Sequence, residues 1–191
     1  MEAEVPPPTA MDLVAEFIKK RYDDIVKKYV QDGGWEPWFQ SEFLDFITIT
    51  AGENQRYSGR EELIWDKPHD KDKVDILTCY MIGKENFVEA IEFKCASTRQ
   101  DYHETDLGRR MKEDIKKLRD GMPFVKKFVL ADQKMFYAVS IGIALDPVSA
   151  AYTKNTLTEL LGNKWSSFSW IPEDGSKRTI TAFTYWGHAD R

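Results

Sequence analysis

The sequence has little cysteine and no long apolar run. Its 191 residues include only two cysteines, Cys79 and Cys95, which argues against a disulfide framework and against a cysteine metal site. No apolar run approaches the roughly 18 residues that a membrane-spanning helix needs, so we expect no membrane association. Residues 1–10 are acidic and proline-rich, unlike a signal peptide, and they predict a disordered leader. These absences favour the cytoplasm or the nucleus, and they leave open export by a route without a signal peptide.

The composition is that of a globular chain. Apolar residues make up 42% and aromatic residues 13%, and the length fits a single domain over residues 11–191. Helical and strand-like periodicities alternate along the chain, which predicts an α/β fold with a mixed central β-sheet flanked by helices. We expect helices over 11–30, from 37 onward, over 106–121 and over 147–162, and strands over 62–65, 73–80, 87–94, 136–145, 165–171 and 179–186.

Two of the expected strands carry charged residues among apolar ones. Because successive side chains of a strand point to opposite faces, Glu92 and Lys94 share a face. Asp75 lies in the preceding strand, and the sixteen residues between it and Glu92 suit an antiparallel hairpin. Such a hairpin would bring two carboxylates and an ammonium group together at its end. This combination predicts a divalent-cation site with a catalytic lysine.

The arrangement resembles the PD-(D/E)XK nuclease superfamily, which has the restriction-endonuclease-like fold. The resemblance rests on Asp75 and on Glu92-Phe93-Lys94, which matches the E-x-K at the end of the family's third strand. Residues 38–42 look like the helix that supplies an extra acidic residue in many members, and residues 113–118 look like the helix after the motif strand. The order of helix, strands, motif, helix and strand covers roughly residues 34–145. One departure is that Val74 stands where many members have proline.

The resemblance implies a magnesium-dependent endonuclease, with Mn²⁺ as a substitute for Mg²⁺. Asp75, Glu92 and the backbone carbonyl of Phe93 would hold the metal, because Mg²⁺ prefers oxygen ligands. Lys94 would orient or deprotonate the attacking water, or neutralise the developing negative charge. Glu42 would complete a second-metal or outer-shell position.

Glu42 is also singled out by its place in the expected helix. At about 100° per residue, it falls near Trp35 and Phe46, at the edge of the apolar face. A carboxylate beside a buried stripe costs free energy unless it is paired or bound to a cation. The simpler alternative is a glutamate whose stem packs while its carboxylate reaches water. Asp45, one turn further on, is the lesser candidate.

Basic residues are concentrated directly after the motif strand. The whole chain has a net charge of −5, yet residues 106–127 carry eight basic and four acidic side chains. We expect Arg109, Lys112 and Lys116 on this helix to bind the phosphates of a nucleic acid, with DNA favoured over RNA. The alternative is a solvated helix face with mixed charges.

Two other functional interpretations stay open. The first is a catalytically idle nuclease-fold protein that serves in binding or immunity, which the acidic net charge favours. The intact set of Asp75, Glu92 and Lys94 argues against it. The second is an unrelated α/β domain in which the E-x-K spacing arose by chance. A second copy of the chain or an inhibitor protein would be compatible as a further partner.

Overall fold

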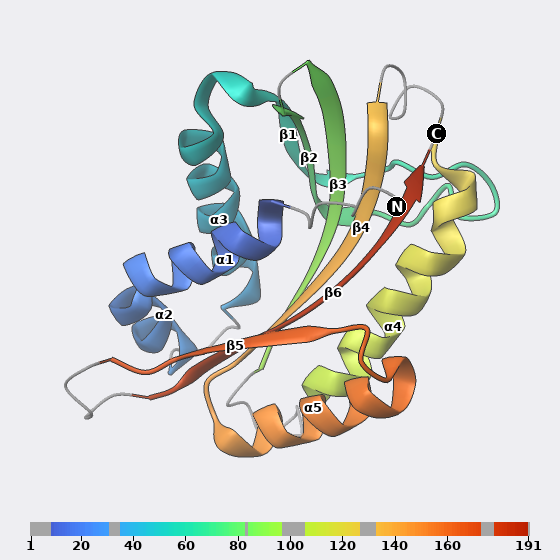
Figure 1. Cartoon of the computed structure of the whole chain (residues 1–191). Coiled ribbons are helices and arrows are strands. Elements are labelled where there is room, and N and C mark those ends of the chain that lie inside the picture. Colours follow the sequence, from blue (N-terminus) through green and yellow to red (C-terminus); the bar gives the residue numbers. More distant parts are fainter. Residues whose placement is uncertain are drawn as a thin grey trace, which may run out of the picture.

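A computed structural model describes residues 9–30, 35–82, 84–96, 106–126, 133–172 and 178–190. In this part of the chain, six strands form one sheet in the order β1-β2-β3-β4-β6-β5 (Figure 1). β3 and β4 are parallel and the other neighbours are antiparallel, so the sheet is mixed as predicted. The strands are β1 (Gln55–Glu62), β2 (Val74–Ile82), β3 (Glu85–Cys95), β4 (Gln133–Ala144), β5 (Ser166–Trp170) and β6 (Ile180–Asp190).

Helices cover both faces of the sheet, which confirms the predicted α/β class (Figure 1). The helices on one face are α1 (Thr9–Lys20), α2 (Tyr22–Tyr29) and α3 (Glu36–Ala51). The helices on the other are α4 (Asp106–Gly121) and α5 (Pro147–Leu161). None of the helices in the described ranges is long and apolar enough to cross a membrane.

The alternation of β3 divides the core between the two faces. Phe87, Ile91 and Phe93 pack in the cluster that includes α1, α2 and α3. Val88 and Ala90 point the other way, toward the side that α4 covers. Because β3 lies in the middle of the sheet, both of its faces are buried, and any charged residue on it must find its partners inside the protein.

The hairpin of β2 and β3 sets the register of the candidate site. Ile76 pairs with Ile91 in the antiparallel ladder, so the preceding Asp75 lies across from Glu92. This confirms the predicted hairpin. In the parallel ladder, β4 places Ser140 beside Glu92 and Gly142 beside Lys94.

Three predicted boundaries were wrong. The helix expected over 11–30 is interrupted at Arg21, which separates α1 from α2. The strand expected over 62–65 is displaced, because β1 begins at Gln55 and ends at Glu62, and Trp65 makes only an isolated bridge to Val125. β1 is a largely polar edge strand, so it lacks the apolar alternation by which buried strands are found. Residues 1–8 of the expected leader lie outside the described ranges, whereas residues 9 and 10 already belong to α1.

Candidate functional site

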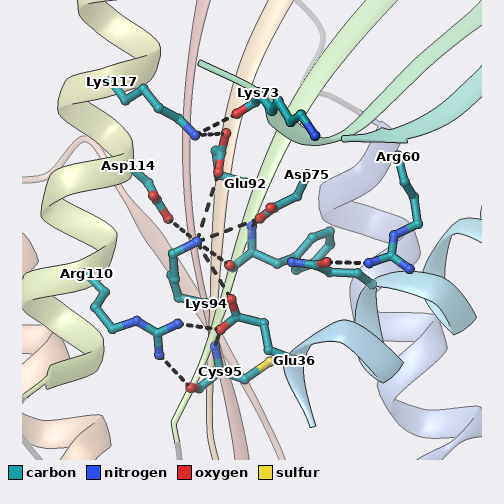
Figure 2. Close-up of polar contacts among 12 residues, drawn as sticks. Glu36, Arg60, Lys73, Asp75, Glu92, Lys94, Cys95, Arg110, Asp114 and Lys117 are labelled. Carbon is teal, nitrogen blue, oxygen red and sulfur yellow. Dashed lines mark hydrogen bonds and ion pairs between the residues drawn. The ribbon is translucent and has the colours of Figure 1, made fainter. Parts of the chain in front are cut away.

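Lys94 is the centre of a group of carboxylates on the face of the sheet that α4 covers (Figure 2). Asp75 comes from β2, Glu92 from β3, Glu36 from the start of α3 and Asp114 from α4. We call Lys94 and these four carboxylates the Lys94 cluster. The distances from Lys94 Nζ are 3.1 Å to Asp114 Oδ2, 3.7 Å to Asp75 Oδ2, 3.8 Å to Glu36 Oε1 and 4.0 Å to Glu92 Oε2.

Backbone contacts at Phe93 hold the middle of the cluster. The amide of Phe93 donates a 2.7 Å hydrogen bond to Asp75 Oδ2, which ties the carboxylate of β2 to β3. The carbonyl of Phe93 accepts a 2.8 Å hydrogen bond from Lys94 Nζ. The ring of Phe93 packs against Phe39 and Phe43 on the opposite face. Apolar packing on one face of β3 therefore holds Phe93 in place, while its amide and carbonyl contact Asp75 and Lys94.

Glu36 lies in the first turn of α3 and joins the cluster at the C-terminal end of β3. Its Oε2 accepts a 2.8 Å hydrogen bond from the amide of Cys95 and lies 2.7 Å from Arg110 Nη2. Trp35, the residue before α3, donates from Nε1 to the carbonyl of Ala96 at 2.7 Å. These contacts fix the start of α3 against the end of β3.

Helix α4 contributes three charged side chains to the site. Arg110, Asp114 and Lys117 are separated by four and three residues, so they share one face of the helix. Lys117 Nζ lies 2.5 Å from Glu92 Oε1, and it also donates a 2.8 Å hydrogen bond to the carbonyl of Lys73. The three basic groups near the cluster, Lys94, Arg110 and Lys117, thus each contact a carboxylate.

Burial makes two of the carboxylates easier to protonate. Burial and the nearby Asp75 charge raise the pKa of Glu92 to about 8, although Lys117 opposes the shift. Burial also raises the pKa of Asp114 to about 6, opposed chiefly by Lys94. A carboxyl group with a raised pKa must lose its proton before it binds a metal, and a nearby cation favours that loss.

Lys94 remains an ammonium in these surroundings. Burial by itself would lower its pKa, but the carboxylates of the cluster outweigh burial and raise it, with Asp114 and Asp75 contributing most. A lysine with a raised pKa is a poor general base at neutral pH. Of the roles expected for Lys94, orienting water and neutralising negative charge are therefore the ones that its surroundings favour.

The structure does not bring Glu42 into the cluster. Glu42 Oε2 lies 2.6 Å from Arg21 Nη1, in an ion pair between α3 and the start of α2. Glu36 precedes Glu42 by six residues, about 600° along a helix, so the two side chains lie on different faces. The acidic residue that α3 supplies is thus Glu36. Asp45 is exposed on α3.

Sequence reasoning missed Glu36, Asp114 and Lys117. Asp114 had a detectable signal, because it lies three residues after Met111 and four before Leu118, inside the apolar stripe of α4. A carboxylate at such a position is buried and needs a partner. Glu36 had only a weak signal, its place just before Pro37 at the start of α3.

The residues expected to bind nucleic acid lie on the opposite side of α4. Arg109, Lys112 and Lys116 are all exposed there. Arg109 is paired with Glu113 through a 2.6 Å contact between its Nη1 and the carboxylate.

The donor atoms of the cluster suit a hard divalent cation. Asp75, Glu92 and the carbonyl of Phe93 offer only oxygen, the ligand that Mg²⁺ prefers. Glu92 Oε1 and Asp114 Oδ2 are buried and contact cations, yet neither receives a directed hydrogen bond. Their lone pairs are thus incompletely used. Within the described ranges, however, no three acidic, histidine or cysteine side chains are already arranged around a common metal position, and Lys94 lies among the carboxylates instead.

No protein-family model, no curated protein and no solved structure matches this chain. The comparisons therefore leave the resemblance to PD-(D/E)XK nucleases as a hypothesis. Any functional argument must rest on the geometry and charges of the Lys94 cluster.

Proposed function

We propose that the chain is a magnesium-dependent endonuclease that hydrolyses phosphodiester bonds in nucleic acid, with DNA favoured over RNA. The observation that carries the proposal is the meeting of Asp75, Glu92 and Lys94 at the end of the β2–β3 hairpin. The order of elements also supports it, since α3, β1 to β3, α4 and β4 follow the helix, strands, helix and strand of the restriction-endonuclease-like fold.

The residues of the site have two roles: some would bind the metal, and Lys94 stabilises the negative charge that develops on the phosphate. The carboxylates of Asp75 and Glu92 and the carbonyl of Phe93 would hold Mg²⁺. When bound, Mg²⁺ would polarise the phosphate and lower the pKa of water. Lys94, held as an ammonium, donates hydrogen bonds to the phosphate oxygens as negative charge develops on them. Glu36 and Asp114 keep the ammonium in place from two sides.

The reaction consumes one water molecule for each bond broken. The water oxygen forms a bond to phosphorus while the bond from phosphorus to one ester oxygen breaks. The water releases one proton to solvent, and the departing ester oxygen takes up one proton. The products are a phosphomonoester end and a hydroxyl end. The exposed Lys112 and Lys116 on α4 would bind neighbouring phosphates without reading the base sequence.

The direct test is cleavage of supercoiled plasmid DNA and of structured RNA, each with Mg²⁺, with Mn²⁺ and with EDTA. We expect cleavage of the plasmid with either metal and none with EDTA. Lys94→Ala should lower the rate about 10²-fold or more, because it removes the group that stabilises the developing charge. The exposed Asp45→Asn on α3 is the matched control and should cleave like the parent.

Two results would contradict the proposal. The first is a parent protein that cleaves neither substrate with either metal. The second is a folded Lys94→Ala variant that cleaves as fast as the parent, since the proposed mechanism depends on that ammonium.

A binding protein with an idle site is the second candidate, and a specific observation favours it. Three of the four carboxylates in the Lys94 cluster already have a basic group of the chain within 3.1 Å. These pairs offset part of the carboxylate charge without a metal. For this candidate, the parent would bind nucleic acid or a protein partner with the same affinity in EDTA and in Mg²⁺.

A further inference from the structure

Lys117 has the shortest ion-pair contact with a carboxylate that is proposed to hold metal. Its Nζ lies 2.5 Å from Glu92 Oε1, whereas Lys94 Nζ lies 4.0 Å from Glu92 Oε2 (Figure 2). Glu92 is only 1% exposed, so water can do little to replace this ammonium. Lys117 is consequently the principal counter-ion of the ionised form of Glu92 when no metal is bound.

A divalent cation and the Lys117 ammonium compete for the same oxygen. Two cations placed on one buried carboxylate repel each other strongly, because the protein interior screens charge less than water does. The side chain of Lys117 is 27% exposed, so it has a route to solvent, while Glu92 has none. When the carboxylate takes up a divalent cation, Lys117 is the partner that can move.

The displaced ammonium remains at the rim of the site. Lys117 also donates to the carbonyl of Lys73, the residue before β2 and two positions before Asp75. This hydrogen bond to the backbone just before β2 limits how far Lys117 can withdraw. A phosphate that approaches the metal position would meet a lysine that has just lost its carboxylate partner.

We propose that Lys117 is a built-in counter-cation of Glu92, which a divalent cation displaces and which then binds a phosphate of the substrate. This inference rests on the proposed function, since it requires metal at Asp75 and Glu92. It predicts that metal and nucleic acid bind cooperatively, each favouring the other through Lys117.

The first test measures metal binding rather than cleavage. Mn²⁺ is titrated calorimetrically into the parent, Lys117→Met, Asp75→Asn and Arg119→Met. Lys117→Met should bind Mn²⁺ about tenfold more tightly or better, because the competing charge is gone. Arg119→Met removes one positive charge from the exposed side of the same helix and should match the parent within about twofold.

The second test measures the coupling. Binding of a fluorescent 20-base-pair DNA duplex is followed by anisotropy with Ca²⁺ and with EDTA at equal ionic strength. The parent should bind the duplex at least about tenfold more tightly with Ca²⁺, and Lys117→Met should lose most of this gain. An equal gain in the parent and in Lys117→Met would contradict the proposed role of Lys117.

A measurement on the parent covers the case in which Lys117→Met does not fold. The ¹H–¹⁵N signal of the Lys117 ammonium, assigned from its absence in Lys117→Arg, should shift and broaden as Mg²⁺ is added. A signal that stays unchanged at saturating Mg²⁺ overturns the displacement.

If Asp75→Asn abolishes Mn²⁺ binding while Lys117→Met has no effect on it, only this inference fails. If the parent binds no Mn²⁺, the proposed function fails with it.

Discussion

Glu92 is a carboxylate whose charge depends on its neighbours. It is almost fully buried, and burial together with Asp75 raises its pKa to about 8. Lys117 opposes this shift by favouring the ionised form, and the charge of Asp114 adds to the shift. At neutral pH without metal, ionised Glu92 is therefore costly to the folded state. Carboxylates with strongly shifted pKa values are concentrated at functional sites.

We expect Glu92→Gln to stabilise the metal-free protein. A glutamine has nearly the same shape but no charge to desolvate or to repel Asp75, so the free energy of unfolding at pH 7 in EDTA should rise by about 1–2 kcal/mol. Urea denaturation followed by circular dichroism measures it. Asp45→Asn, on the surface of α3, is the control and should change stability by less than about 0.5 kcal/mol. A Glu92→Gln variant less stable than the parent would mean that the pair with Lys117 outweighs the cost of burial.

Helices α3 and α4 each carry charged residues on more than one face, and the residues on each face have different partners. On α4, Arg110, Asp114 and Lys117 point toward β3, whereas Lys112 and Lys116 point to solvent. On α3, Glu36 and Glu42 also lie on different faces of the helix. Glu36 contacts Arg110 and lies beside Lys94, and Glu42 pairs with Arg21. The helix period places the members of each such set on different faces of the helix.

The two glutamates of α3 form a matched pair for mutation. Glu36→Gln should lower cleavage of plasmid DNA by about tenfold or more, because it removes a carboxylate that holds the Lys94 ammonium. Glu42→Gln should cleave within about twofold of the parent and lose no more than about 1 kcal/mol of stability, since its pair with Arg21 is partly exposed. Equal losses of cleavage in both variants would contradict the assignment of Glu36.

The site brings together segments that are far apart in the chain. Carboxylates from α3, β2, β3 and α4 meet around one ammonium, although Glu36 and Asp114 are separated by 78 positions. The sheet places β2 and β3 side by side. The first turn of α3, at the C-terminal end of β3, and helix α4, on one face of the sheet, then supply the other two carboxylates. The metal position proposed here therefore exists only in the folded chain, so metal binding and folding must be linked.

Metal should raise the melting temperature of the parent. A ligand that binds only the folded state stabilises it by about 2.7 kcal/mol at a hundred times its Kd, which corresponds to roughly 5–10 °C for a chain of this size. Differential scanning calorimetry with EDTA and with Mn²⁺ measures the shift. Asp75→Asn should show less than a third of it. A shift of equal size in Asp75→Asn would place the bound metal elsewhere.

The sequence by itself determined the parts of the fold that depend on local pattern. The alternation of β3 put Glu92 and Lys94 on one face, the spacing to Asp75 predicted the hairpin, and the apolar stripe of 106–121 matches α4. These features could be read because side-chain periodicity follows from backbone geometry alone. The polar edge strand β1 had no such pattern, since a strand exposed to solvent need not alternate.

Only the tertiary structure decided which further residues surround Lys94. Glu36 and Glu42 are both acidic residues of one helix, and nothing local shows which of them faces β3. The choice depends on how α3 packs, through Phe39 and Phe43, against Phe93. Lys117 likewise resembled its basic neighbours in sequence, yet the docking of α4 placed it against Glu92. Long-range packing sets the orientation of each helix about its axis, and that orientation determines which charges meet.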